Sequence, residues 1–328
     1  MNTEKFTALI KEADEIIIIG HKNPDFDSVG AAVGLFSIAK KFDKKCCMLL
    51  SETSDTASKL INKLKSNEEF EFMFLNYKNF CFPENKNVLV IVADTCRMAL
   101  VENTSILEKA SKIAVIDHHN KSSDFIKDAD YIYHNLDSSS ASEMVVEIIR
   151  DMDCGIKLSP LAAEALLSGI IVDTKNFCFK TTDKTFLAAA YLKQMGAESI
   201  NVKNLFREDL KKFKERYLIL NNSEIFCDII LMSKCPEGFE NPLLVAAQSA
   251  DDFLNVSGVE ASFVVCKVVD TIYVCGRSLG KINVLSILEK IGGGGNVEIS
   301  GAQIESSTTD KVYAELKEII KEYLKEVF

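Results

Sequence analysis

Four short apolar runs, separated by longer amphipathic stretches, constrain the first half of the chain most strongly. The runs are Glu15–Ile19, Cys46–Leu50, Val88–Val92 and Lys112–Ile116. Runs this short are typical of buried strands, and their alternation with helical patterns is typical of a parallel sheet with crossover helices. We therefore predict an α/β fold built on a parallel sheet.

The pattern changes after residue 139. Helices are predicted at Ser140–Met152, Pro160–Val172 and Lys184–Met195, and the charged segment Phe206–Leu220 has the spacing of a connecting helix. Strands are predicted at Glu224–Met232, Pro242–Ala247, Glu260–Val268 and Thr271–Cys275, before helices at Asn283–Lys290 and Asp310–Val327. We predict a first domain over residues 1–185, a helical linker over 186–223 and a smaller α+β domain over 224–328.

Length and charge limit the classes of function. A chain of 328 residues fits two domains of common size. Its net charge of −10 works against a long nucleic-acid partner, which is held by neutralising many phosphates, but is compatible with a small phosphate ligand. No apolar run reaches the ~18 residues of a membrane helix, and the start of the chain is polar. We expect a cytoplasmic protein with no membrane partner.

Acidic residues and histidines gather at the ends of four apolar segments. In chain order they are His21, Asp25 and Asp27; Asp94; Asp117, His118 and His119; and Asp173. An isolated aspartate after a strand is usually a turn or cap residue, and Asp27 is well placed to cap the next helix. Three of the four histidines of the chain lie in these motifs, however, and this coincidence favours a shared site. We interpret the fourth, His134, as structural.

Converging strand ends would crowd at least four carboxylates into one crevice, which requires compensating positive charge. Four aspartates and two divalent cations balance when the imidazoles are neutral. A mixture of carboxylates and imidazoles suits a hard or borderline ion such as Mn²⁺, and two such ions suit phosphoryl chemistry. We predict two divalent metal ions, with Mn²⁺ preferred, and hydrolysis of a phosphate ester.

These motifs resemble those of the DHH phosphoesterase family. The matching stretches are "GHKNPDFDS", "ADT", "DHH" and "VDT". The resemblance implies six metal ligands at His21, Asp25, Asp27, Asp94, His118 and Asp173. It also implies that Asp94 bridges the two ions, that His119 faces the substrate phosphate, and that Asp117 supports the site from behind the ligands.

The second half resembles the DHH-associated domain, whose glycine tract lets backbone approach a nucleotide. The substrate contacts that we infer here are Arg277, Ser278, Gly293, Gly294, Gly295 and Asn296. Two positions depart from the family pattern. Asn296 stands where a histidine usually follows the glycines, and Asn120 and Lys121 stand where two arginines usually follow the DHH triplet.

Within the family, the chain is most similar to the catalytic region of GdpP-type cyclic-di-AMP phosphodiesterases. This implies hydrolysis of cyclic-di-AMP to pApA by two-metal activation of a bridging water. One alternative is a nanoRNase or pAp phosphatase acting on short linear nucleotides, because "ISGAQ" after the glycine tract is similar to those enzymes. Another is a catalytically weak nucleotide sensor. The apolar stripe of the last helix is core packing in our interpretation, with a homodimer surface as the alternative.

Overall fold

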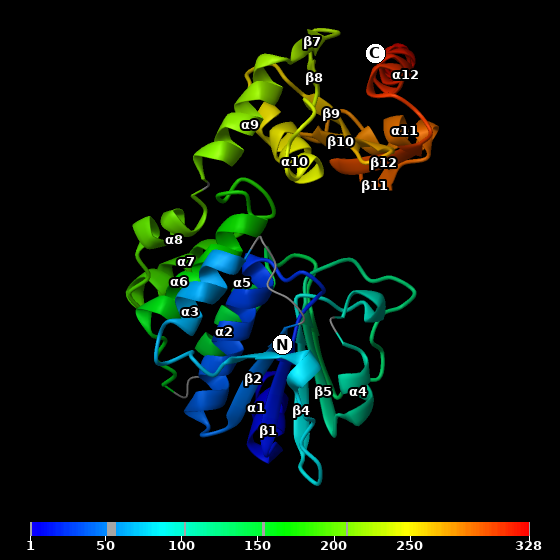
Figure 1. The fold of residues 1–328 in the computed structure, drawn as a ribbon. Helices are drawn as coiled ribbons and strands as arrows, with labels where there is room; N and C mark the ends of the chain where they lie inside the picture. The colour runs from blue at the N-terminus through cyan, green and yellow to red at the C-terminus, as the bar shows by residue number, and fades with distance from the viewer. Residues whose placement is uncertain (1, 51–56, 102, 153–154, 208, 328) are drawn as a thin grey trace. The chain divides into compact units, whose positions relative to one another are not determined.

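The chain forms two compact units, each built on its own six-stranded sheet (Figure 1). The structure is a computed structural model that describes residues 2–50, 57–101, 103–152, 155–207 and 209–327. The first unit ends at Arg207 and the second continues to the end of the chain. The predicted fold class, a parallel-sheet α/β unit with a smaller α+β unit, is confirmed.

The sheet of the first unit is parallel throughout and has the order β3-β2-β1-β4-β5-β6. Its strands are β1 (Glu15–Ile19), β2 (Lys45–Leu50), β3 (Phe74–Asn76), β4 (Val88–Ala93), β5 (Lys112–Asp117) and β6 (Tyr131–His134). Along the chain, β2 and β3 are added to the sheet on one side of β1, and β4, β5 and β6 are then added on its other side. The order therefore reverses between β1 and β4, and the carboxyl ends of strands at such a switch point form a crevice where ligands bind.

Helices cover both faces of this sheet. They are α1 (Thr3–Glu12), α2 (Phe26–Lys41), α3 (Ser58–Lys65), α4 (Ser105–Lys109), α5 (Ala141–Asp151), α6 (Pro160–Asp173), α7 (Asp183–Gln194) and α8 (Ser199–Leu205), with 3₁₀ turns η1 (Tyr77–Asn79) and η2 (Met98–Leu100). Helices α2, α3, α5 and α6 lie on one face and α4 on the other (Figure 1). The central strands β1 and β4 are consequently buried along their whole length, which explains their continuous apolar runs.

Glycines let α2 and α6 cross at close range. A Cβ added at Gly30 would lie 2.6 Å from the carbonyl oxygen of Ala165, and one at Gly169 would lie 2.3 Å from Ser142 Oγ and 2.7 Å from Asp27 Oδ1. No real Cβ makes such contacts. The crossing brings the start of α2 and the end of α6, which both carry predicted ligands, to the same edge of the sheet.

The second unit has a mixed sheet of order β11-β12-β10-β9-β8-β7, in which only the β8–β9 pair is parallel. Its elements are α9 (Leu210–Asn221), β7 (Glu224–Phe226), β8 (Ile230–Lys234), α10 (Pro242–Phe253), β9 (Ala261–Val268), β10 (Thr271–Ser278), α11 (Val284–Leu288), η3 (Glu289–Ile291), β11 (Gly294–Gly295), β12 (Ile299–Glu305) and α12 (Thr309–Val327). Helices α11 and α12 cover one face, and α9 and α10 the other.

Several local predictions for the second half were wrong. Pro242–Ala247 begins helix α10, because the Asn241 side chain caps it and Pro242 occupies its first turn. The single strand predicted over Glu224–Met232 is a hairpin of β7 and β8. Helix α9 accounts for most of the predicted connecting segment, of which residue 208 lies outside the described residues.

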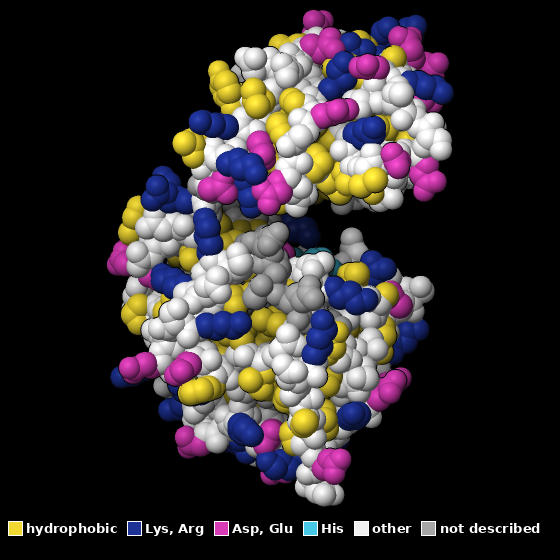
Figure 2. Space-filling view, viewed as in Figure 1, with side chains coloured by type: hydrophobic (Ala, Val, Ile, Leu, Met, Phe, Trp, Pro, Cys, Tyr) yellow, Lys and Arg dark blue, Asp and Glu magenta, His cyan; other side chains and the backbone are white. Residues whose placement is uncertain are grey.

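Two surface features bear on partners. Acidic and basic side chains are interspersed on the visible face of each unit (Figure 2). Among the described residues, no helix combines the length and the apolar character needed to cross a membrane.

Candidate functional site

The predicted ligands gather beside the reversal of strand order in the first unit. His21 follows β1, Asp94 follows β4 and Asp117 ends β5. Asp25 and Asp27 begin α2, where Asp25 and not Asp27 is the cap: Asp25 Oδ1 accepts from the backbone N–H of Asp27 at 2.9 Å. Asp173 is the last residue of α6, so the fourth motif ends a helix and not a strand.

His21 forms the first cluster with two carboxylates. Its Nε2 lies 3.3 Å from Asp94 Oδ2 and 3.8 Å from Asp25 Oδ1. Asp94 has a φ of 64°, a left-handed conformation that aspartate tolerates better than most residues. The Asp94 N–H donates to the carbonyl of Ile116 on β5 at 2.9 Å, which holds this conformation in place. Strained backbone of this kind is concentrated at functional sites.

His118 forms the second cluster. Its Nε2 lies 3.2 Å from Asp173 Oδ2, 3.5 Å from Asp94 Oδ1 and 3.8 Å from Asp27 Oδ2. Asp94 thus offers one oxygen to each histidine and belongs to both clusters. The structure brings all six predicted ligands together in two groups that share one carboxylate.

Asp27 is fixed by the start of α5. Its two oxygens accept from the backbone N–H groups of Ala141 at 2.6 Å and Ser142 at 2.8 Å. The partial positive charge of a helix amino terminus stabilises a carboxylate at this position. Gly169 leaves the space that this carboxylate fills. The protein itself therefore holds the Asp27 carboxylate in position.

The electrostatics of the site call for cations. Burial alone would lower the pKa of His21 and of His118, but the surrounding carboxylates reverse this and raise the pKa of each to about 11. Burial, together with the charges of neighbouring carboxylates, raises the pKa of Asp27. Within the described residues, no lysine or arginine pairs with any of the four aspartates.

Unpaired buried atoms support the same conclusion. Asp94 Oδ1 and both ring nitrogens of His118 are buried and make no hydrogen bond within the described part of the chain. Buried polar atoms are nearly always satisfied, so these atoms are in place for a ligand that the protein itself does not supply. Carboxylates and imidazoles without thiolates fit Mn²⁺ or a similar divalent ion.

A second pair of residues lies next to the clusters. His119 Nδ1 is 2.8 Å from Asp117 Oδ1, and the His119 side chain is 51% exposed, whereas Asp117 is fully buried. Burial alone would raise the pKa of Asp117, but its contacts with His119 and the Cys96 thiol lower it. An ionised carboxylate that holds Nδ1 leaves Nε2 of His119 free to act on a substrate.

Three of the six predicted substrate contacts line one cavity of about 380 Å³ in the second unit, whereas Ser278, Gly293 and Asn296 are not among its lining residues. Arg277, Gly294 and Gly295 line it, with Leu243 and Tyr273 among the other lining residues. Arg277 Nε lies 3.2 Å from Asp251 Oδ2. The cavity is part of the second unit alone.

Two predicted contacts already have partners inside the protein. Ser278 Oγ accepts from the N–H of Gly280 at 3.0 Å and donates to the carbonyl of Glu260. Asn296 Oδ1 accepts from the N–H groups of Glu298 and Ile299, at 2.9 and 2.8 Å, and so closes the turn between β11 and β12.

Comparison with known proteins matches this site to a family. Residues 15–170 match the N-terminal domain of the DHH family. The chain is 35% identical to the cyclic-di-AMP phosphodiesterase GdpP of Geobacillus thermodenitrificans over 96% of its own length and 48% of that protein. The first unit therefore carries a DHH-family N-terminal domain over residues 15–170. It spans about half the length of the GdpP proteins that it matches.

Two further matches extend across the DHH domain and the second unit. The bifunctional oligoribonuclease and PAP phosphatase NrnA of Bacillus subtilis is 28% identical over 94% of this chain and 96% of NrnA. An exopolyphosphatase-related protein from Bacteroides fragilis has a similar fold, with a TM-score of 0.80, 19% identity and coverage of 99% and 97%.

Sequence reasoning did not show which residues support the DHH triplet. His134, interpreted as structural, ends β6, and its Nε2 lies 2.7 Å from the carbonyl oxygen of His119. It forms a compact group with Cys96 and Asp117. The signal in the sequence that could have identified His134 is a histidine at the end of a strand. Gly169 and the amino terminus of α5, which hold Asp27, give no pattern that can be recognised in the sequence.

Proposed function

We propose that the chain is a metal-dependent phosphodiesterase that hydrolyses cyclic-di-AMP to pApA. The observation that carries this proposal is the pair of ligand clusters that share Asp94. The 35% identity to a cyclic-di-AMP phosphodiesterase supports the choice of substrate.

Each cluster would hold one divalent ion. His21, Asp25 and Asp94 would bind the first, and Asp27, His118, Asp173 and Asp94 the second. Two such ions would supply Lewis acidity for the attack of water on phosphorus. Mn²⁺ is our preferred ion because of the mixed carboxylate and imidazole set.

The protein groups would orient the phosphate and move a proton. His119, oriented by Asp117 through its Nδ1, would present Nε2 to a phosphate oxygen or to the leaving oxygen. The cavity beside Gly294 would hold a nucleobase of the substrate, with Tyr273 and Leu243 as its apolar walls. Arg277 would contact a phosphate group.

A second candidate is an oligoribonuclease or pAp phosphatase. The observation that favours it is the 28% identity to NrnA, which extends over 94% of this chain. The same ligand clusters would serve either reaction, so substrate preference distinguishes them.

Chromatographic product analysis tests the proposal. The purified chain is incubated with Mn²⁺ and, separately, with cyclic-di-AMP, pApA and pAp, each with a chelator control. Conversion of cyclic-di-AMP to pApA that stops with chelator is the expected result. Turnover of linear nucleotides alone would assign the second candidate, and metal binding without turnover of any of the three would favour the nucleotide sensor.

A further inference from the structure

His118 lacks the hydrogen bond that normally orients a histidine ligand. Its Nε2 faces the carboxylates of the second cluster, so Nδ1 is the nitrogen left to find a partner outside that cluster. Within the described residues, the buried Nδ1 has no hydrogen-bond partner. Metal-binding histidines almost always donate the N–H of their second ring nitrogen to a carboxylate, a carbonyl or water. The position of this imidazole therefore depends on how firmly the main chain of residues 118 and 119 is held.

This main chain lies beyond the pairing of β5 with β6. Asp117 is opposite His134 in the register of the two strands, and the described register ends at this pair. The N–H of Asn135 then donates to the carbonyl of Asp117 at 3.1 Å. His118 and His119 follow that carbonyl, so the two imidazoles of the triplet stand on a segment that the strand pairing does not reach.

The His134 side chain extends the hold of β6 to this segment. Its Nε2 lies 2.7 Å from the carbonyl oxygen of His119. A carbonyl oxygen can only accept, so this ring nitrogen carries the proton and donates. Asp117 also holds His119, through its N–H at 3.3 Å and its Nδ1 at 2.8 Å. Those two bonds come from inside the triplet, whereas His134 fixes its carboxyl end from another strand.

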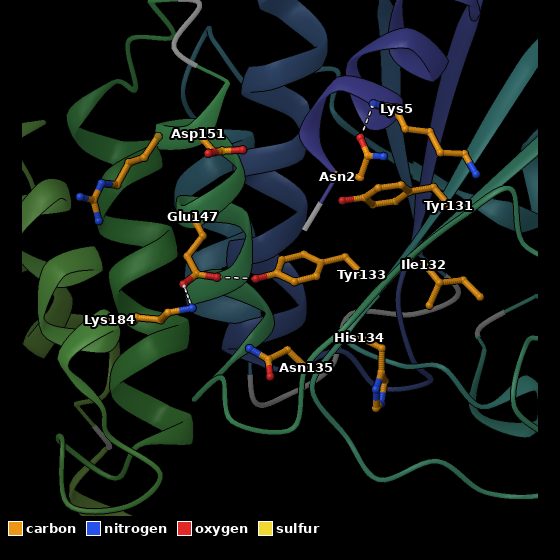
Figure 3. Close-up of a pocket in the computed structure, with 11 residues that line it drawn as sticks. Asn2, Lys5, Tyr131, Ile132, Tyr133, His134, Asn135, Glu147, Asp151 and Lys184 are labelled. Atoms are coloured by element: carbon orange, nitrogen blue, oxygen red, sulfur yellow. Dashed lines mark hydrogen bonds and ion pairs between the residues drawn. The ribbon is translucent and has the colours of Figure 1, made fainter.

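The surroundings of His134 fix the direction of its ring, which lies at the end of β6 (Figure 3). Phe125 meets this ring edge-on, with the two centroids 5.8 Å apart and the planes at 89°. The segment of Phe125 is in turn bound to the loop after β4, because the N–H of Ile126 donates to the carbonyl of Cys96 at 2.9 Å. The ring of His134 is therefore held against the carbonyl of His119.

We propose that His134 is a positioning residue for the metal-ligand clusters. By holding the carbonyl of His119, it fixes the main chain of the triplet and so sets the His118 imidazole against the carboxylates of the second cluster. His134 contacts neither ion nor substrate in this role, which differs from that of Asp117, the carboxylate that orients the His119 ring. The inference rests on the proposed function in treating the clusters as metal sites, and it does not depend on the substrate.

Calorimetric titration with Mn²⁺ tests this inference in the absence of substrate. His134→Phe keeps a ring that packs against Phe125 but cannot donate, whereas the side-chain amide of His134→Gln reaches the position of Nε2 and can donate. We expect one of two ions to bind about tenfold more weakly in His134→Phe, the lower end of the range for groups that orient ligands. His134→Gln should bind both ions nearly as the parent chain does.

Two further variants keep the titration decisive. Tyr133→Phe is the matched control, because it removes the hydrogen bond from Tyr133 to Glu147 on the same strand without touching the triplet (Figure 3). It should bind both ions as the parent chain does. His134→Ala removes the ring altogether and should weaken the same ion as His134→Phe, so the test does not depend on the folding of a single variant. Thermal unfolding is followed in parallel for every variant.

Turnover of cyclic-di-AMP gives a second readout, which depends on the proposed function. The Mn²⁺ concentration for half-maximal turnover should rise about tenfold in His134→Phe and return towards the parental value in His134→Gln. If the parent chain binds Mn²⁺ but does not hydrolyse cyclic-di-AMP, the proposed function fails while the titration still tests His134.

Three results would overturn the proposal. The first is equal Mn²⁺ affinity in folded His134→Phe and in the parent chain. The second is equal weakening of both ions, or no recovery in folded His134→Gln, which would give His134 a general structural role. The third is an additional ion in the parent chain that is lost in His134→Phe. His134, Cys96 and Asp117 offer ligand atoms within 4.8 Å of one another, so that result would make His134 a ligand itself.

Discussion

A methyl group added at Gly169 should disable the second metal site while leaving the fold intact. The Cβ of Gly169→Ala would lie 2.7 Å from Asp27 Oδ1 and 2.8 Å from Asp27 Cα, so the Asp27 carboxylate must move. Overpacking of this kind costs about 1–3 kcal/mol of folding free energy. Replacing glycine in a helix by alanine returns about 1 kcal/mol, which leaves a net loss of about 0–2 kcal/mol.

Gly169→Ala should lose more affinity for metal than its control variant does. Disturbing groups that orient metal ligands typically lowers affinity about 10–100-fold, or roughly 1.4–2.7 kcal/mol. Gly34→Ala is the matched control, because its Cβ would press on Val145 and Leu166 side chains at the packing of α2 against α5 and α6 without contacting a ligand. The assay is calorimetric titration with Mn²⁺, with thermal unfolding in parallel.

Gly169→Ala should bind one of two ions at least tenfold more weakly, and Gly34→Ala should bind both as the parent does. Unchanged titration of Gly169→Ala in a protein of normal stability would refute the assignment of Asp27 as a ligand held by this packing. Equal weakening in both variants would show that the effect comes from general loosening of the helix packing.

Three further predictions concern the other site residues. Gly294→Ala should fold normally, because a Cβ there meets nothing within 4 Å, but it should raise KM if a nucleotide approaches the backbone. Gly295→Ala should destabilise the second unit, because its Cβ would lie 2.3 Å from the carbonyl oxygen of Ile299. Asp117→Asn should lower kcat about 10²–10⁴-fold with metal content retained, since it removes the charge that orients His119 for proton transfer. Asn296→Ala should lower the free energy of unfolding of the second unit by about 1–3 kcal/mol through two lost hydrogen bonds, and Asn296→Asp should lower it less.

Each of these has a contrary outcome. An unchanged KM in Gly294→Ala would remove the glycine tract from the substrate site. Full kcat in Asp117→Asn would show that His119 needs no carboxylate partner. Equal unfolding free energies for Asn296→Ala and the parent protein, measured by denaturant titration, would show that the turn is held by other contacts.

The centre of the first sheet could be predicted because β1 and β4 are buried on both faces. Continuous apolar runs such as Glu15–Ile19 and Val88–Val92 leave little choice of structure, and β1 and β4 were found within one residue of their predicted ends. Strand β6 was missed because it has four residues and a half-exposed edge, so its apolar pattern is weak. Strand β12 contains Gly301, which obscured its signal.

The helix that begins at Pro242 shows a different kind of error. The apolar residues after Pro242 have the composition of a strand over six residues, but Asn241 and Pro242 together form a helix start. Greater weight on this capping signal would have given the correct element.

The candidate site was predictable in its residues but not in its support. Aspartates and histidines at segment ends can be recognised as candidate ligands by their residue type, and the parallel sheet brings their segments to one edge. The contacts that fix Asp27 are different. They involve the α5 amino terminus and Gly169, more than one hundred residues away in sequence, and small residues with backbone N–H groups carry no chemical signature.

The shared carboxylate is tested most directly by counting bound ions. Mn²⁺ is titrated into metal-free protein, and stoichiometry is measured for the parent chain and for Asp94→Asn, which keeps a side chain that tolerates the left-handed backbone. Two ions per parent chain and at most one in Asp94→Asn is the predicted result. A single ion in the parent chain, or two ions bound with parental affinity in Asp94→Asn, would contradict a centre in which Asp94 joins two metals.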